Sequence, residues 1–114
     1  MATTRRTQVK RLTKWVEALR SGKYRQGRGQ LQTAGRYCCL GVACRALPRM
    51  PRPDTREDGR FDDVQLNGVQ LDYLGLEYHE QHALINANDG ERRSFRYIAD
   101  MIEDTIIPRV AEGA

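Results

Sequence analysis

The chain has 114 residues, of which 39% are hydrophobic and 30% charged, and its formal net charge is +4 at pH 7. This length predicts a single domain over residues 1–114, and no apolar run approaches the roughly 18 residues that a membrane-spanning helix needs. The first residues lack the hydrophobic segment of a secretion signal, and three cysteines, two of them adjacent, argue against a disulfide framework. We therefore expect a cytoplasmic protein with no membrane partner.

The charge is divided unevenly along the chain. Residues 1–60 contain 15 lysines and arginines against 4 acidic residues, whereas residues 61–114 contain 4 against 11. Residues 1–36 alone contain ten basic residues and a single acidic one, Glu17. This asymmetry predicts a basic surface that attracts an anion such as nucleic acid, a nucleotide or an acidic protein. The alternative is that the two halves neutralise one another across the folded domain.

Two helices are predicted in the first half of the chain. Residues 7–21 place their apolar side chains on one side of a helical wheel, and Thr7 is a suitable N-cap. Residues 38–47 are almost entirely apolar and end at Pro48, which predicts a short, central, buried helix. Within it, Gly41 would allow another backbone segment to approach closely.

Two hairpins are predicted between and after these helices. Residues 24–26 and 30–33 have no helical period and lie in a glycine-rich stretch, which predicts short strands, with Ala34-Gly35 turning the chain afterwards. Residues 64–71 alternate apolar and polar side chains on both sides of Asn67-Gly68, the pattern of a two-residue hairpin.

The remaining segments predict a long mobile surface loop and two further helices. The loop covers residues 48–63, which hold three prolines and many charges. Residues 79–88 look helical, and a last helix capped by Ser94 and stopped by Pro108 would bury one apolar stripe. The expected fold is α+β, with about four helices packed against a small antiparallel sheet and hairpins near 24–33 and 64–71. The residues of the stripe are Phe95, Ile98, Ala99, Ile102 and Ile106.

The cysteines and histidines permit two kinds of chemistry. Cys38 and Cys39 stand at the N-terminus of a predicted helix, whose dipole lowers a thiol pKa. This position suits a cysteine nucleophile, with His79 or His82 as base and Asn88 or Asp89 as orienter. With Cys44, the same side chains supply ligand types for zinc, but no Cys-x-x-Cys occurs and the histidines are three residues apart. Adjacent cysteines are more often core packing. We therefore expect no catalytic residue, no metal ligand and no cofactor.

Residues 84–100 resemble the first half of a DNA-binding helix-turn-helix. Such a motif needs a following recognition helix, which carries the base contacts. The chain continues instead with Glu103-Asp104, whose charges would repel phosphates, and then with Pro108. Shared helix-hairpin geometry is the simpler interpretation.

The basic, glycine-containing segment 20–37 is the best candidate for a binding site. Glycines allow backbone N–H groups to approach an anion, arginines form forked hydrogen bonds to phosphate, and tyrosines can stack on a base. Asn88 and Asp89 could contact a ribose or a base edge. The alternative is an ordinary hairpin with a solvated basic edge. The predicted ligand-binding residues are Arg20, Lys23, Tyr24, Arg25, Arg28, Arg36, Tyr37, Asn88 and Asp89.

Several of these stretches together resemble a family of small proteins common in bacteriophages and prophages. The resemblance spans most of the chain outside roughly residues 45–70, and Arg45 stands where an acidic residue is usual. It implies no established activity. The residues that carry it are Leu19-Arg20-Ser21-Gly22-Lys23-Tyr24, Tyr37-Cys38-Cys39-Leu40-Gly41, Asn88-Asp89-Gly90, and Ser94-Phe95 followed by Ile98-Ala99-Asp100.

This resemblance implies a function by analogy. Small phage proteins often inhibit bacterial immunity by binding a host protein or by sequestering a nucleotide signal. We therefore expect a phage anti-defence protein that sequesters a phosphate-containing ligand, most specifically a nucleotide-derived immune signal, and acts as a homo-oligomer that builds a concave site between subunits. The alternatives are a protein that binds nucleic acid or inhibits a host protein, and a cysteine-dependent hydrolase.

Overall fold

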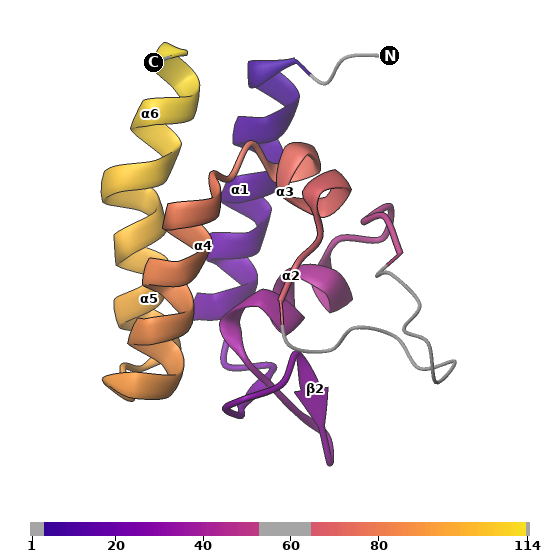
Figure 1. Ribbon diagram of the computed structural model, residues 1–114, viewed down its shortest axis with the longest axis vertical. Coiled ribbons are helices and arrows are strands. Elements are labelled where there is room, and N and C mark those ends of the chain that lie inside the picture. The colour runs from indigo at the N-terminus through magenta and orange to yellow at the C-terminus, as the bar shows by residue number, and fades with distance from the viewer. Residues whose placement is uncertain (1–3, 53–64, 114) are drawn as a thin grey trace.

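The computed structural model describes residues 4–52 and 65–113, which form an α+β fold (Figure 1). Helix α1 lies in the middle, and the small sheet lies at the end of the molecule opposite both termini. No helix in the described ranges combines the length and the apolar character needed to cross a bilayer. The helices are α1 (Arg5–Arg20), α2 (Cys39–Ala46), α3 (Gly68–Leu74), α4 (Tyr78–Ile85) with the π-helical turn η1 (Asn86–Gly90), and α5 (Phe95–Met101) with the π-helical turn η2 (Ile102–Ile106) and α6 (Ile107–Glu112).

Helix α1 carries the central part of the core. It begins two residues before the expected segment because Thr4, not Thr7, is the N-cap, and its hydroxyl accepts a hydrogen bond from the Thr7 N–H at 3.2 Å. The buried indole of Trp15 donates to the Cys39 carbonyl at 2.8 Å and so joins α1 to α2. Of the predicted apolar stripe, Leu12, Trp15, Val16 and Leu19 are buried, and Val9 is half-buried against the core.

Helix α2 is central and buried, as the sequence predicts. Gly41 packs directly against the backbone of Leu31, and a Cβ at Gly41 would collide with the Leu31 carbonyl group. The predicted close approach is therefore confirmed. It places Leu31, the residue directly before the edge strand that follows it, on α2.

The three strands form a mixed sheet, not an antiparallel hairpin. They are β1 (Arg25–Gln26), β2 (Gln32–Thr33) and β3 (Arg36–Tyr37), in the order β1-β3-β2. Strand β3 pairs with β1 in parallel and with β2 in antiparallel orientation, so the expected pairing of residues 24–26 with 30–33 is wrong. The predicted turn at Ala34-Gly35 is confirmed: both residues have positive φ, 49° and 76°, and they join β2 to β3.

A glycine allows β3 to insert next to β1. The Gly27 N–H donates to the Tyr37 carbonyl at 2.6 Å, and a Cβ at Gly27 would lie 2.9 Å from the Cβ of Arg36. Any larger residue would hold the two strands apart. The sequence shows the glycine but not which strand takes the place beside it.

The expected hairpin at residues 64–71 is wrong, because its second half is helix α3. Asn67 caps this helix: its side chain accepts from the Gln70 N–H at 2.8 Å, and the Gln70 side chain accepts from the Asn67 N–H at 2.9 Å. This reciprocal capping box stabilises a helix start with the same residues that alternate along a strand. Of the predicted loop at 48–63, residues 53–63 lie outside the described part of the chain.

The C-terminal helix confirms its predicted start and corrects its predicted end. The Ser94 hydroxyl accepts from the Tyr97 N–H at 3.2 Å, and all five residues of the predicted stripe are buried. Pro108 does not stop the helix but lies in the first turn of α6. The preceding turn η2 is π-helical, with the Ile107 N–H donating to the Ile102 carbonyl five residues back. A wider turn moves the carbonyls away from the proline ring, which otherwise breaks a helix.

Candidate functional site

The sheet brings two arginines side by side. Arg25 of β1 and Arg36 of β3 are register partners, and Thr33 of β2 is opposite Arg36 on its other side. Side chains in one register row point to the same face of a sheet, and all three are exposed. Like charges directly opposite one another destabilise a sheet. Within the described part of the chain, no carboxylate forms an ion pair with either arginine.

The two tyrosines of the segment lie closer to the core. The Tyr24 and Tyr37 rings meet edge to face, with centroids 5.6 Å apart and an interplanar angle of 88°, and both are half-buried. Tyr37 belongs to the register row next to that of the arginine pair, so it points to the opposite face of the sheet. Lys23 is exposed, with its ammonium 6.0 Å from the Tyr24 ring centroid. Of the two tyrosines, Tyr24 is therefore the better placed to contact a ligand near Lys23.

Two of the predicted phosphate-binding arginines are occupied by contacts to the C-terminal half. Arg20 pairs with Asp100 at 2.6 Å and with Glu103 at 3.0 Å, and the hydrogen bonds to Glu103 and Asp100 raise the pKa of its guanidinium. Arg28 donates from Nε to the Asn88 carbonyl at 3.1 Å. In this arrangement part of the charge asymmetry is neutralised across the fold, which leaves Arg25 and Arg36 as the exposed pair.

Asn88 has a structural position that its sequence context did not reveal. It is 0% exposed, and its side-chain amide donates to the Gly27 carbonyl at 2.9 Å and to Asp89 Oδ1 at 2.7 Å. Its Oδ1 accepts from Gln26 Nε2 at 2.9 Å. The turn η1 therefore fastens the loop after β1 to the helical layer, and Asn88 offers no free atom to a ligand. After this turn, Arg92 has a positive φ of 56°.

Cys38 and Cys39 are buried in the core, and Cys44 is half-buried against it. Burial raises the pKa of the Cys38 thiol and of the Cys44 thiol to about 11, and it raises the pKa of Cys39 well above its usual value. His79 and His82 lie exposed on α4, where the His82 ring packs edge to face on Tyr78 at 4.4 Å. Among the described residues, no group of three or more His, Cys, Asp or Glu side chains is arranged to hold a metal ion. The helix start at Cys38 thus lowers the thiol pKa less than burial raises it.

These thiols are expected to react slowly. With a pKa near 11 rather than 9, the Cys38 thiol carries about a hundredfold less thiolate at neutral pH, because thiolate fraction falls tenfold per pKa unit. Since folding favours the neutral thiol, the stabilising contribution is present below the unfolded pKa and is lost as pH rises toward 11. Labelling with an aromatic disulfide reagent, native against urea-unfolded, checks this. A thiol labelled at the unfolded rate at neutral pH would restore the cysteine-hydrolase alternative.

Part of this architecture matches a known sequence family. A family model described as a domain of unknown function (DUF8296) matches residues 6–50. The matched segment contains α1, the three strands and α2, and therefore the arginine pair. No curated protein and no solved structure matches the chain.

Proposed function

We propose that this protein binds a phosphate-containing ligand without catalysing a reaction on it, and that Arg25 and Arg36 hold the phosphate. The observation that carries the proposal is their register pairing: two exposed arginines are neighbours on one face of the sheet, and no carboxylate of the described residues forms an ion pair with either. An arginine is the preferred partner for a phosphate because its planar donors match two oxygens at once. A bound phosphate would attract both guanidinium groups and so offset the repulsion between them.

Neighbouring residues support the same ligand class. The Thr33 hydroxyl lies in the same register row and can donate a hydrogen bond to a phosphate oxygen. Lys23 adds a positive charge at the start of the segment, next to the Tyr24 ring. A nucleotide offers the phosphate that the cations attract and the flat base that a tyrosine can stack on.

The resemblance to small phage proteins supports a more specific role. A phage protein that captures a nucleotide-derived immune signal would protect the infecting phage, and tight capture needs no catalytic group. The arginine row is exposed, so a second copy of the chain would supply the walls that enclose a small ligand. The proposed active form is therefore a homo-oligomer.

Nucleic acid is the second candidate for this face. An exposed row of cations suits a phosphate chain, which needs no enclosing walls. A polynucleotide would bind with an affinity that falls steeply as salt rises, because each phosphate contact releases counterions. An enclosed nucleotide would depend less on salt.

A thermal-shift panel tests the proposal. It contains cyclic mono-, di- and trinucleotides, ADP-ribose derivatives, short DNA and RNA. A ligand at a hundred times its Kd stabilises the folded state by about 2.7 kcal/mol. In a domain of this size, that corresponds to a rise in Tm of roughly ten degrees. Size-exclusion chromatography of the complex then gives the oligomeric state.

The paired substitution Arg25→Glu with Arg36→Glu is expected to abolish the shift while leaving the Tm of the free protein nearly unchanged, since both side chains are exposed. The matched control is Arg6→Glu with Arg52→Glu, which changes the net charge equally at exposed positions outside the sheet. Full ligand affinity in the Arg25→Glu, Arg36→Glu variant would show that this arginine pair does not hold the phosphate. A panel without any shift would favour a host protein as target.

A further inference from the structure

A basic groove runs along the flank of α1 that faces the end of α2. Two hollows adjoin there, one of about 200 Å³ beside Tyr73 and one of about 360 Å³ beside Tyr24, and Lys14 lines both. The lining residues of α1 begin at Thr7 and end beyond the helix at Ser21. At 1.5 Å per residue this stretch is about 21 Å long. The opposite wall is the chain that leaves α2, from Ala46 to Arg49.

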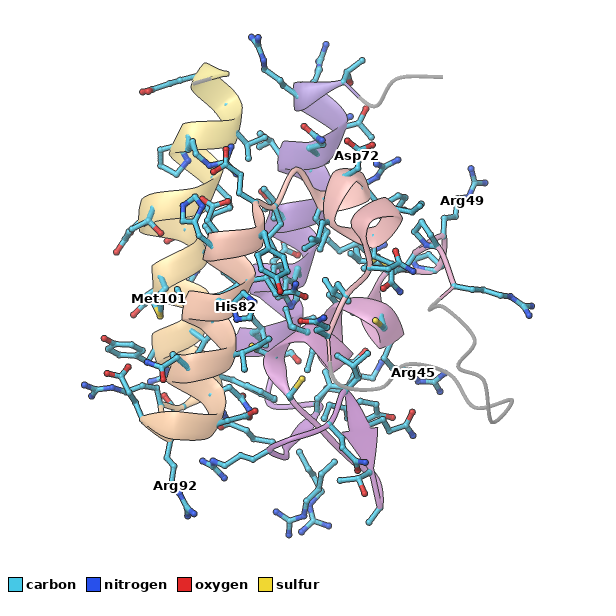
Figure 2. The ribbon with its side chains drawn as sticks, viewed as in Figure 1. Arg45, Arg49, Asp72, His82, Arg92 and Met101 are labelled. Atoms are coloured by element: carbon cyan, nitrogen blue, oxygen red, sulfur yellow. The ribbon has the colours of Figure 1, made fainter. Side chains whose placement is uncertain are left out.

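The charge of this groove is one-sided. Lys10, Lys14, Lys23 and Arg49 line it, and none of them forms an ion pair with a described residue. Among the described residues, Glu17 is the one carboxylate that lines either hollow. Figure 2 shows Arg49 projecting from the side of the molecule opposite to Met101.

Each hollow also contains a flat side chain. In the smaller one, the Arg11 guanidinium lies over the Tyr73 ring, 3.6 Å from its centroid, and donates from Nη1 to the Tyr73 carbonyl at 2.8 Å. In the larger one, Tyr24 is fixed by its edge contact with Tyr37. Planar groups held in place at both ends of a cationic groove are the elements of single-strand recognition, in which cations follow the backbone and bases stack on flat side chains.

We propose that this groove binds a short single-stranded nucleic acid. At 3.4 Å per stacked nucleotide, about 21 Å accommodates about six nucleotides. Lys10, Lys14 and Lys23 hold the phosphates, and Tyr24 and the Arg11–Tyr73 stack each receive a base. A duplex is a poorer ligand, because its base faces are already stacked on one another. An acidic peptide would use the cations but not the flat side chains. Lys23 and Tyr24 are common to this groove and to the proposed nucleotide site, whereas Arg25 and Arg36 do not line the groove.

Fluorescence anisotropy with labelled oligothymidine and oligouridine of about ten nucleotides tests the proposal, since this length exceeds the expected site. The test variant is Lys10→Gln with Lys14→Gln, which keeps two good helix formers in α1. Loss of two phosphate contacts should reduce the slope of log K against log salt by about 1.4. Near 0.1 M salt this corresponds to about 20-fold weaker binding. The charge-matched control, Arg92→Gln with Arg96→Gln, should keep the wild-type slope.

The proposed stacking of a base on Tyr24 is tested by a separate variant. Tyr24→Leu keeps an apolar side chain against Tyr37 and removes the ring. Binding should weaken about fivefold or more at an unchanged salt slope, because a base stack is lost but no phosphate contact. Circular dichroism and Tm check that every variant is folded.

Three outcomes would contradict the proposal that this groove binds single-stranded nucleic acid. They are an absence of oligonucleotide binding, a wild-type salt slope in the Lys10/Lys14 variant, and equal competition by polyglutamate of the same length. The Arg25→Gln, Arg36→Gln variant separates the two sites: the groove requires that it still binds the oligonucleotide. If the Arg25→Gln, Arg36→Gln variant loses binding while the Lys10/Lys14 variant keeps it, the phosphates bind at the sheet. The groove is then not the binding site.

Discussion

Replacement of Gly41 by alanine is expected to destabilise the protein by about 2 to 3 kcal/mol, and so to lower its Tm by roughly ten degrees. An added Cβ would lie 2.6 Å from the Leu31 carbonyl carbon and would overlap its oxygen. Both obstacles are backbone atoms, so no rotamer change relieves the overlap, and α2 must move away from Leu31, the residue directly before β2. The Cys38 N–H, which donates to the Leu31 carbonyl at 3.3 Å, would then lose its acceptor. The net loss exceeds the gain of about 1 kcal/mol that alanine brings inside a helix.

Gly68→Ala is the matched control for this experiment. Gly68 is the first residue of α3, is exposed and has no heavy atom within 4 Å of the added Cβ. Alanine there should stabilise by about 0.5 kcal/mol through the unfolded chain alone. Urea denaturation of both variants measures the two free energies of unfolding. Equal values would show that the contact between α2 and Leu31 is not tight.

Replacement of Asn88 by alanine is expected to cost about 2 to 3 kcal/mol. The buried Gly27 carbonyl would lose the donor at 2.9 Å, and Gln26 Nε2 would keep only its second acceptor, the Arg93 carbonyl at 2.8 Å. An unpartnered buried polar group costs more than the net gain from a hydrogen bond, because water cannot replace the lost partner. Strand β1 should therefore open more often.

Hydrogen exchange gives the local test for Asn88. The amide of Gly27, which donates to the Tyr37 carbonyl at 2.6 Å, should exchange faster in Asn88→Ala. Asn86→Ala lies in the same π-helical turn at an exposed position and should change stability by no more than about 0.5 kcal/mol. If the two variants are equally stable, the Asn88 carboxamide does not fasten the sheet to η1.

Elements fixed by local patterns were predictable from the sequence, and elements fixed by long-range competition were not. The apolar stripe of α1 and the Ser94 cap of α5 need only residues within one or two turns, and both are confirmed. Around Asn67-Gly68 two local patterns coincide, since a hairpin turn and a helix cap use the same residues. The capping box with Gln70 decides in favour of the helix. The spacing of Asn67 and Gln70 can be read from the sequence, so the signal for the helix was present but competed with the hairpin pattern of the same residues.

The sheet order and the proline in the last helix are two further features that local sequence patterns did not predict. The insertion of β3 between β1 and β2 depends on the Gly27–Arg36 contact, which joins segments nine residues apart. Pro108 is a reliable stop signal only for a helix that keeps its α-helical turn, and η2 does not keep it. A sequence pattern cannot show that the preceding turn has widened.

The candidate site was partly predictable for a related reason. The basic, glycine-containing segment indicated an anion site, but its five cations looked equivalent: Arg20, Lys23, Arg25, Arg28 and Arg36. Only folding shows that Arg20 meets Asp100 and Glu103, whereas Arg25 and Arg36 become neighbours. Charge content is a property of the sequence, but charge pairing is a property of the fold.

The position of the two chain ends has a practical consequence. Arg5 and Gly113 line the same hollow at one end of the molecule, while the sheet lies at the other end (Figure 1). A fluorescent protein, an affinity tag or a surface tether attached at either end would therefore leave the arginine face pointing outward. Because Arg5 and Gly113 lie so close together, a short linker could also join them, and the chain could be circularly permuted.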